Sequence, residues 1–78
     1  MERPFDATDF PVRFGRRLRL VRNDRRMSQL ALAARVGLVQ GTICNIERGY
    51  TVPSIFTVFV LAQALEVHPK TLLFDEEE

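Results

Sequence analysis

The sequence predicts an all-α domain, and three observations support this prediction. No segment alternates apolar and polar residues for long enough to require a strand. Apolar residues instead recur at three- and four-residue spacing in short runs, which Ser, Gly and Pro separate. The chain has 78 residues, few enough that one core must serve all of it. We therefore expect a single compact domain of five short helices.

The chain divides into an arm, a folded domain and a tail. Residues 1–11 are expected to form an irregular arm, because prolines interrupt it, and to pack Phe5 and Phe10 back on the domain. Residues 12–74 form the domain. Residues 75–78 are all acidic and are expected to remain solvated.

The first two helices are predicted from spacing and end signals. Pro11 suits the start of a first helix that runs to about residue 25 and buries an apolar stripe of Phe14, Leu18 and Val21. Ser28 can cap a second helix at residues 29–36. Gly37 suits the end of that helix, since glycine readily adopts the left-handed conformation found there.

Three further helices follow. The third is expected from Val39 or Gln40 to Arg48, with Gly49 ending it. The fourth spans residues 55–65 after the turn and cap at Pro53 and Ser54. One apolar face at helical spacing is expected to be buried against the first three helices: Ile55, Val58, Leu61, Ala62 and Leu65. A short fifth helix begins at Pro69 and closes over the core with residues 71–74. His68 is interpreted as its cap rather than as a catalytic or metal-binding group.

Charge is unevenly distributed along the chain, although the net charge is only +1. Residues 1–12 carry −2, residues 13–48 carry +7 and residues 49–78 carry −4. Every basic residue of the middle segment is an arginine, whose planar guanidinium suits phosphate oxygens. The segment is interpreted either as a phosphate-binding surface or as an ordinary solvated helix face.

Several classes of protein are disfavoured by the sequence. No run approaches the roughly 18 apolar residues of a membrane span, and the N-terminus does not resemble a signal peptide, so we expect a cytoplasmic protein that binds no membrane. The single cysteine, Cys44, cannot form an internal disulfide or supply a zinc site by itself. We find no paired carboxylates, nucleophile with a base, or phosphate-cradling loop, and expect no enzyme activity, catalytic residue, metal or cofactor.

The third helix has two faces when its residues are placed at about 100° each on a wheel. Val39, Ile43 and Ile46 fall within about 60° and are expected to be buried. Opposite them lie small or polar residues: Gln40, Gly41, Cys44, Asn45 and Arg48. Amide side chains can bond adenine in the major groove, and arginine can bond guanine or phosphate, so this face is interpreted as a reader of DNA.

The segment MSQLALAARVGLVQGTICNIERG resembles the helix-turn-helix of the lambda-repressor and Cro-like (XRE-type) transcriptional regulators. The shared positions are Ser28, Gln29, Leu32, Ala33, Gly37, Leu38, Ile43, Ile46, Glu47, Arg48, Gly49, Pro53 and Ser54. Later positions also match the family's fourth and fifth helices: Ala62, Ala64, Leu65, Val67, Pro69 and Leu72. The resemblance covers residues 12–74 and implies a five-helix DNA-binding domain.

The resemblance also implies roles for individual residues. Base-reading positions are Gln40, Gly41, Thr42, Cys44 and Asn45. Gln29 matches a position that commonly bonds a DNA phosphate. Apart from the resemblance, four further residues are predicted to contact phosphates: Arg48, Arg17, Tyr50 and Thr51. Arg22 and Glu47 match a structural ion pair that joins the first helix to the third.

This chain departs from its relatives at several of these positions. Leu30 and Ala31 stand where relatives often have acids, Val39 where a polar cap is usual, and Tyr50 and Thr51 where basic residues are common. Gly41 lowers helix propensity by about 1 kcal/mol relative to alanine. A close approach to a DNA backbone and simple tolerance both explain a glycine there.

The fourth helix also carries a second apolar face, made of Phe56, Phe59 and Val60. Relatives are often polar at Phe56 and Val60, so this surface is expected to be a homodimer interface. The alternative is a deeper core formed by the N-terminal arm. A two-fold dimer would present two third helices about one DNA turn apart and require a roughly palindromic site.

The predicted function is sequence-specific binding of double-stranded DNA by a transcriptional repressor or activator. Among single-domain relatives, the controller proteins of restriction-modification systems fit best, beside phage repressors and antitoxins. RNA polymerase is a further candidate partner, through the acidic tail. The alternative function is a protein-binding module, such as an antitoxin, that holds its partner through the fourth helix.

Overall fold

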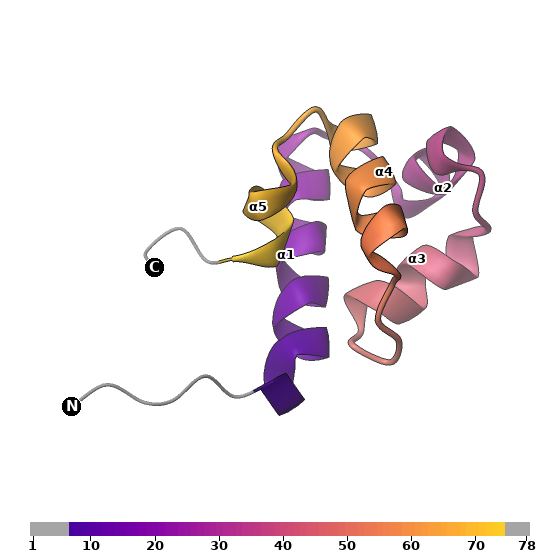
Figure 1. The fold of residues 1–78 in the computed structure, drawn as a ribbon. Coiled ribbons are helices and arrows are strands. Elements are labelled where there is room, and N and C mark those ends of the chain that lie inside the picture. The colour runs from indigo at the N-terminus through magenta and orange to yellow at the C-terminus, as the bar shows by residue number, and fades with distance from the viewer. Residues whose placement is uncertain (1–6, 75–78) are drawn as a thin grey trace.

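The computed structural model describes residues 7–74 of the chain, and these residues are all-helical, as predicted. A short 3-10 helix, η1 (Ala7–Asp9), leads into α1 (Phe10–Asp24). Four further helices follow: α2 (Gln29–Val36), α3 (Gln40–Glu47), α4 (Ile55–Leu65) and α5 (Pro69–Leu73). Figure 1 shows them as one bundle.

The predicted helix ends are confirmed by hydrogen bonds. The hydroxyl of Ser28 accepts from the N–H of Ala31 at 2.9 Å, and that of Ser54 accepts from the N–H of Thr57 at 3.1 Å. At α5 the His68 Nδ1 accepts from the N–H of Lys70 at 3.1 Å. These side chains satisfy backbone donors that the first turn of a helix leaves without partners.

The first helix begins one residue earlier than predicted, at Phe10, with Pro11 inside its first turn. Proline is tolerated there because the first helical N–H groups have no intrahelical acceptor. Phe10 is half-buried, and its ring centroid lies 5.8 Å from that of Phe14. It therefore packs on the domain as part of α1 rather than from an irregular arm. Phe5, the rest of residues 1–6 and the acidic tail at 75–78 lie outside the described residues.

The core takes buried side chains from all five α-helices. These are Phe14, Leu18, Leu32, Ala33, Ile43, Ile46, Val58, Leu61, Ala62, Leu65 and Leu72. Val21 is half-buried at the edge of this cluster. The core matches the apolar stripes predicted from helical spacing, with two exceptions.

Val39 and Ile55 were predicted to be buried, and both predictions are wrong. The Val39 side chain is 70% exposed and that of Ile55 is 64% exposed. Val39 is the N-cap of α3 and has an extended backbone, so it does not share the helical wheel of Ile43. Ile55 is the first residue of α4, ahead of the turns that cover the core.

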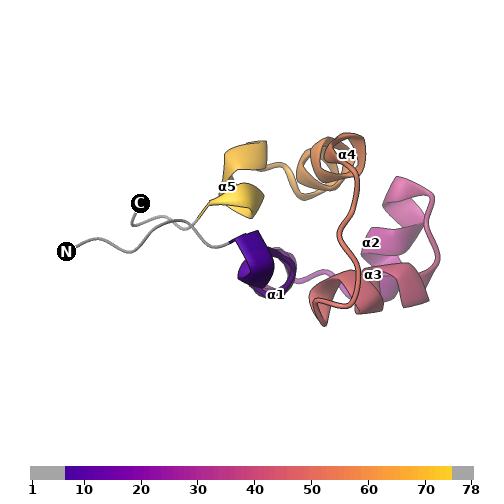
Figure 2. The same ribbon diagram turned by 60° about the horizontal axis from the view of Figure 1, so that its bottom comes forward.

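The arrangement of the helices leaves α3 at an edge of the molecule. Helix α3 packs against α1 and α2, while α4 packs against α2 and α5. In both views α3 lies on the side opposite α5 (Figures 1 and 2). One side of α3 therefore faces solvent. No helix in residues 7–74 is both long and apolar enough to cross a membrane.

Candidate nucleic-acid interface

A tight turn sets the relation between α2 and α3. Gly37 ends α2 with φ 75°, a left-handed conformation that glycine adopts without the steric cost of a Cβ atom. The N–H of Leu38 then bonds the carbonyl of Ala33 at 2.9 Å. The chain leaves α2 sharply and begins α3 three residues after Gly37, so the two helices form a helix-turn-helix.

The outer face of α3 carries the predicted polar residues. Gln40, Gly41 and Asn45 are exposed, while Thr42 and Cys44 are half-buried at its margins. The opposite face buries Ile43 and Ile46 in the core: Ile43 is fully buried, and Ile46 is 2% exposed. The two-sided pattern expected from the sequence is therefore present, apart from Val39.

A hydrogen-bonded network links α1 and α2 to α3. The ion pair implied by the resemblance is present: Arg22 Nε donates to Glu47 Oε2 at 2.6 Å, and Arg22 Nη2 donates to Glu47 Oε1 at 3.0 Å. Arg22 Nη1 also donates to the carbonyl of Met27 at 2.7 Å, in the turn between α1 and α2. This network fixes the C-terminal end of α3 against the rest of the domain.

The environment of this ion pair keeps Arg22 charged. The Arg22 side chain is 10% exposed and the Glu47 side chain 3% exposed. The hydrogen bond to Glu47 raises the pKa of Arg22, and the attraction of the carboxylate adds to this against the opposing effect of burial. Both partners have several hydrogen bonds, as buried charges require.

Gln29 extends the network to the N-terminal end of α3. Its Nε2 donates to Glu47 Oε1 at 3.0 Å, and its Oε1 lies 3.5 Å from Gln40 Nε2, at the limit of a hydrogen bond. Gln29 is half-buried and Gln40 is exposed. The structure thus brings together the predicted phosphate-binding Gln29 and the predicted base-reading Gln40.

Sequence reasoning missed the close crossing of α1 and α3 at Gly15. A Cβ atom added there would lie 2.4 Å from the carbonyl oxygen of Ile46 and 2.6 Å from that of Glu47. Only glycine allows the two backbones to approach this closely. One feature of the sequence indicates this crossing: Gly15 lies seven residues before Arg22, and this spacing places both residues on one side of α1.

Three of the residues that are predicted to contact phosphates lie close together in the segment after α3. The Arg48 guanidinium lies 5.9 Å from the centroid of the Tyr50 ring, within the range of a cation–π contact. Gly49 has φ 78° and packs against Val12, where an added Cβ atom would lie 2.9 Å from a valine methyl group. Arg48, Tyr50 and Thr51 are all exposed.

The structure does not bring Arg17 to this surface. Its Nε donates to the carbonyl of Leu72 at 2.7 Å and its Nη2 to the carbonyl of Leu73 at 2.8 Å. Arg17 is two residues from Gly15, about 200° around α1, and so faces α5 rather than α3. The guanidinium binds the last carbonyl groups of α5, which corrects the expectation that it faces a phosphate.

Other arginines of the basic segment remain at the surface. Arg16, Arg19, Arg25, Arg26, Arg35 and Arg48 are exposed. They give the domain a positive field that favours a polyanion. Within residues 7–74 no cluster of three or more His, Cys, Asp and Glu side chains could hold a metal ion.

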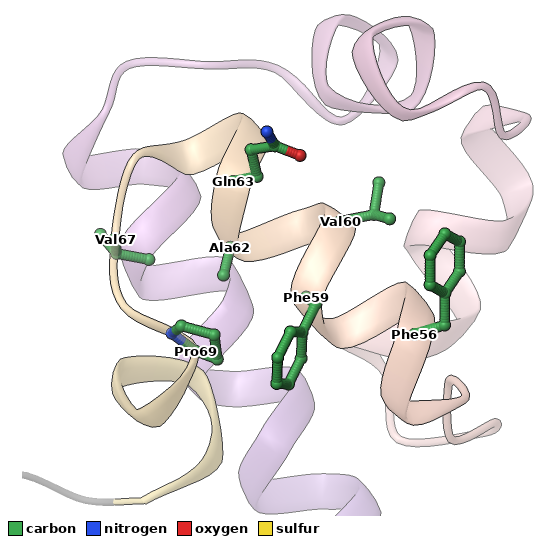
Figure 3. Close-up of a pocket in the computed structure, with 7 residues that line it drawn as sticks. All are labelled: Phe56, Phe59, Val60, Ala62, Gln63, Val67 and Pro69. Carbon is green, nitrogen blue, oxygen red and sulfur yellow. The ribbon is translucent and has the colours of Figure 1, made fainter.

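A second exposed surface lies on α4. The side chains of Phe56 and Phe59 are 75% and 53% exposed, and that of Val60 is half-buried. They border an open hollow of about 440 Å³, which is also lined by Ala62, Gln63, Val67 and Pro69 (Figure 3). The predicted apolar face is therefore uncovered by any described part of the chain.

Comparisons with known proteins agree with this geometry. The HTH_3 helix-turn-helix family model matches residues 18–72. The restriction-modification controller protein C.AhdI from Aeromonas hydrophila is 38% identical, with a TM-score of 0.76 over 78% of this chain and 92% of that protein. No curated protein sequence matches the chain significantly.

Two other solved structures share the fold. A hypothetical transcription factor, NHTF, from Neisseria is 25% identical, with a TM-score of 0.83 over 99% of this chain and 88% of that one. An HTH_3 family transcriptional regulator from Vibrio cholerae is 27% identical, with a TM-score of 0.80 over 86% of this chain and 38% of that one. The chain belongs to the HTH_3 helix-turn-helix family of DNA-binding transcriptional regulators.

Proposed function

We propose that the chain binds a roughly palindromic DNA site as a homodimer, with α3 of each copy in the major groove. The observation that carries this proposal is the polar, exposed face of a helix whose other face is fixed in the core. Gln40 and Asn45 are its reading amides, and Thr42 and Cys44 contact bases or nearby backbone at its margins. Gly41 adds no side chain between α3 and the groove.

Phosphate contacts position this helix. Gln29 uses one N–H of its amide on Glu47, and its second N–H remains for a phosphate oxygen. Arg48, Tyr50 and Thr51 reach the backbone from the segment after α3. The network through Glu47 then ties phosphate binding to the orientation of the reading helix.

The apolar surface on α4 supports the dimer. Two large aromatic side chains are mostly exposed beside an apolar hollow, a combination typical of protein interfaces rather than of monomer surfaces. In a two-fold dimer the same surface serves both copies, so each ring meets the partner's hollow. Such a dimer presents two copies of α3 to one face of DNA, which explains a palindromic site.

The proposed biological role is that of a controller protein in a restriction-modification system. The identity of 38% with C.AhdI, over 92% of that protein, supports this role. A second candidate is an antitoxin-like module that uses the α4 surface to hold another protein. The exposed Phe56 and Phe59 also suit this alternative, because they can pack against any apolar partner.

Selection of binding sites from a random DNA library, repeated at two salt concentrations, tests the proposed function. We expect one enriched motif with two-fold symmetry and an affinity that falls about tenfold or more between 50 and 200 mM salt, because phosphate contacts release counterions. Failure to enrich a motif, together with tight binding to another protein, would establish the module instead.

A further inference from the structure

Val39 is exposed where the sequence predicts burial. It is the N-cap of α3, with φ −89° and ψ 156°, and its side chain is 70% exposed. Its carbonyl accepts from the N–H of Thr42 at 3.0 Å, which holds the residue at the start of the helix. The side chain therefore projects from the end of α3 without joining the core.

A valine at this position gives the free protein little stability. A Ser, Thr, Asp or Asn side chain would accept a hydrogen bond from the first turn of α3, and Val39 provides none. Its methyl groups are not buried in compensation. An exposed β-branched apolar residue at a cap position thus has no structural explanation within the described domain.

The exposed side chain of Val39 lies directly before the reading face, which is the exposed polar side of α3 that carries Gln40, Gly41 and Asn45. Gln40 follows it and is exposed. At Gly41 an added Cβ atom would meet nothing within 4 Å, so the space at that position is open. The reading face thus begins with an apolar contact point beside an amide.

We propose that Val39 is a specificity-determining residue that packs on the 5-methyl group of a pyrimidine in the major groove. This inference rests on the proposed placement of α3. Thymine carries that methyl group on its major-groove edge, whereas cytosine and uracil carry hydrogen there. 5-Methylcytosine presents the same group, so the contact recognises the methyl rather than the hydrogen-bonding pattern of the base.

The test replaces thymine by deoxyuridine at each position of the selected site in turn. For the wild-type protein we expect a loss of about fourfold in affinity at one thymine in each half-site, the ratio expected from removing one buried methyl group. Val39→Ser removes both valine methyl groups but supplies a capping hydroxyl, so α3 is retained. This variant is expected to bind the thymine and deoxyuridine sites equally well.

Val52→Ala is the matched control, because Val52 is 52% exposed but lies in the segment after α3. It should keep the wild-type ratio between the two sites. A second arm places cytosine or 5-methylcytosine at the sensitive position. Preference for 5-methylcytosine over cytosine supports recognition of the methyl group itself, and equal binding of these two bases would contradict it.

Two results would overturn the inference while leaving the proposed function intact. One is an enriched site at which no thymine is sensitive to loss of its methyl group. The other is the same sensitivity in Val39→Ser as in the wild type. If no DNA site is enriched at all, both the proposed function and this inference fail.

Discussion

Gly15 and Gly41 both lie inside helices, but their surroundings differ. Gly15 meets the backbone of α3 at its closest approach to α1, whereas Gly41 faces open space. The same change to alanine therefore has opposite consequences for stability. In one case the added methyl group pushes two helices apart, and in the other it removes only the entropic cost of a glycine.

We expect Gly15→Ala to lower the free energy of unfolding by about 1–3 kcal/mol, because backbone carbonyls cannot move aside as a flexible side chain can. Gly41→Ala should raise it by up to about 1 kcal/mol. Urea denaturation of both variants measures the difference. Equal effects of the two changes would contradict the close crossing of α1 and α3.

DNA binding by Gly41→Ala separates the two explanations for this glycine. A loss of affinity for the selected site in a variant that folds more stably shows that the groove needs the space above Gly41. Unchanged affinity shows that glycine is only tolerated there. Fluorescence anisotropy on the same DNA decides between them.

The Arg22–Glu47 pair leads to a prediction about stability. Glu47→Ala leaves the guanidinium of Arg22 partly buried without its carboxylate, so we expect a loss of about 3–5 kcal/mol in the free energy of unfolding. Glu66→Ala is the control. Its carboxylate lies 4.0 Å from Arg25 and its side chain is 78% exposed, so the loss should be under about 1 kcal/mol.

The pH dependence of this pair follows from the raised pKa of Arg22. A group whose pKa is raised by folding stabilises the fold below its unfolded pKa, and this contribution is lost only as the pH rises through the folded value. For an arginine both values are strongly alkaline. Titration of Arg22 therefore causes no loss of stability at neutral or mildly alkaline pH, and urea midpoints measured between pH 7 and pH 9 test this.

At the scale of the helices, the residues that begin or end each helix make the fold predictable from the sequence. Ser28, Gly37, Ser54 and His68 each act through local hydrogen bonds or local backbone conformation, which sequence alone encodes. The bounds of α2 and α4 were accordingly predicted well. The Arg22–Glu47 ion pair is predicted from the family resemblance alone, because no local sequence pattern indicates it.

The sequence-based predictions are wrong at residues whose position depends on the tertiary structure rather than on local sequence. Val39 fits a helical wheel by number but sits on extended backbone, and Ile55 precedes the packed turns of α4. Arg17 was assigned to phosphate because it is an arginine in a basic segment, yet its partners are carbonyls 55 and 56 residues away. Such contacts have no periodic signature in the sequence.

The salt dependence of DNA binding tests whether Arg17 contacts a phosphate or only joins α1 to α5 through its hydrogen bonds. We expect Arg17→Met to destabilise the docking of α5 while leaving the slope of log K against log salt unchanged. Arg48→Met, in contrast, should reduce the magnitude of that slope by about 2 for the dimer, because it removes one phosphate contact from each copy. A lower slope for Arg17→Met would restore it as a phosphate ligand.

For the whole molecule, the α4 surface predicts assembly. Phe56→Glu places a charge in the proposed dimer interface and should yield monomers in analytical ultracentrifugation, as should Val60→Glu. Leu20→Glu is the control, since Leu20 is 62% exposed on α1. A dimer that survives the changes at Phe56 and Val60 would place the interface elsewhere.

Sequence-specific DNA binding depends above all on base reading by the outer face of α3. The most direct measurement compares Gln40→Ala and Asn45→Ala with the wild type on the selected site and on random DNA, with Asn23→Ala on α1 as the control. Each of the two α3 changes is predicted to cost about 1–3 kcal/mol on the selected site and much less on random DNA. Equal losses on both kinds of DNA would contradict direct reading by this helix.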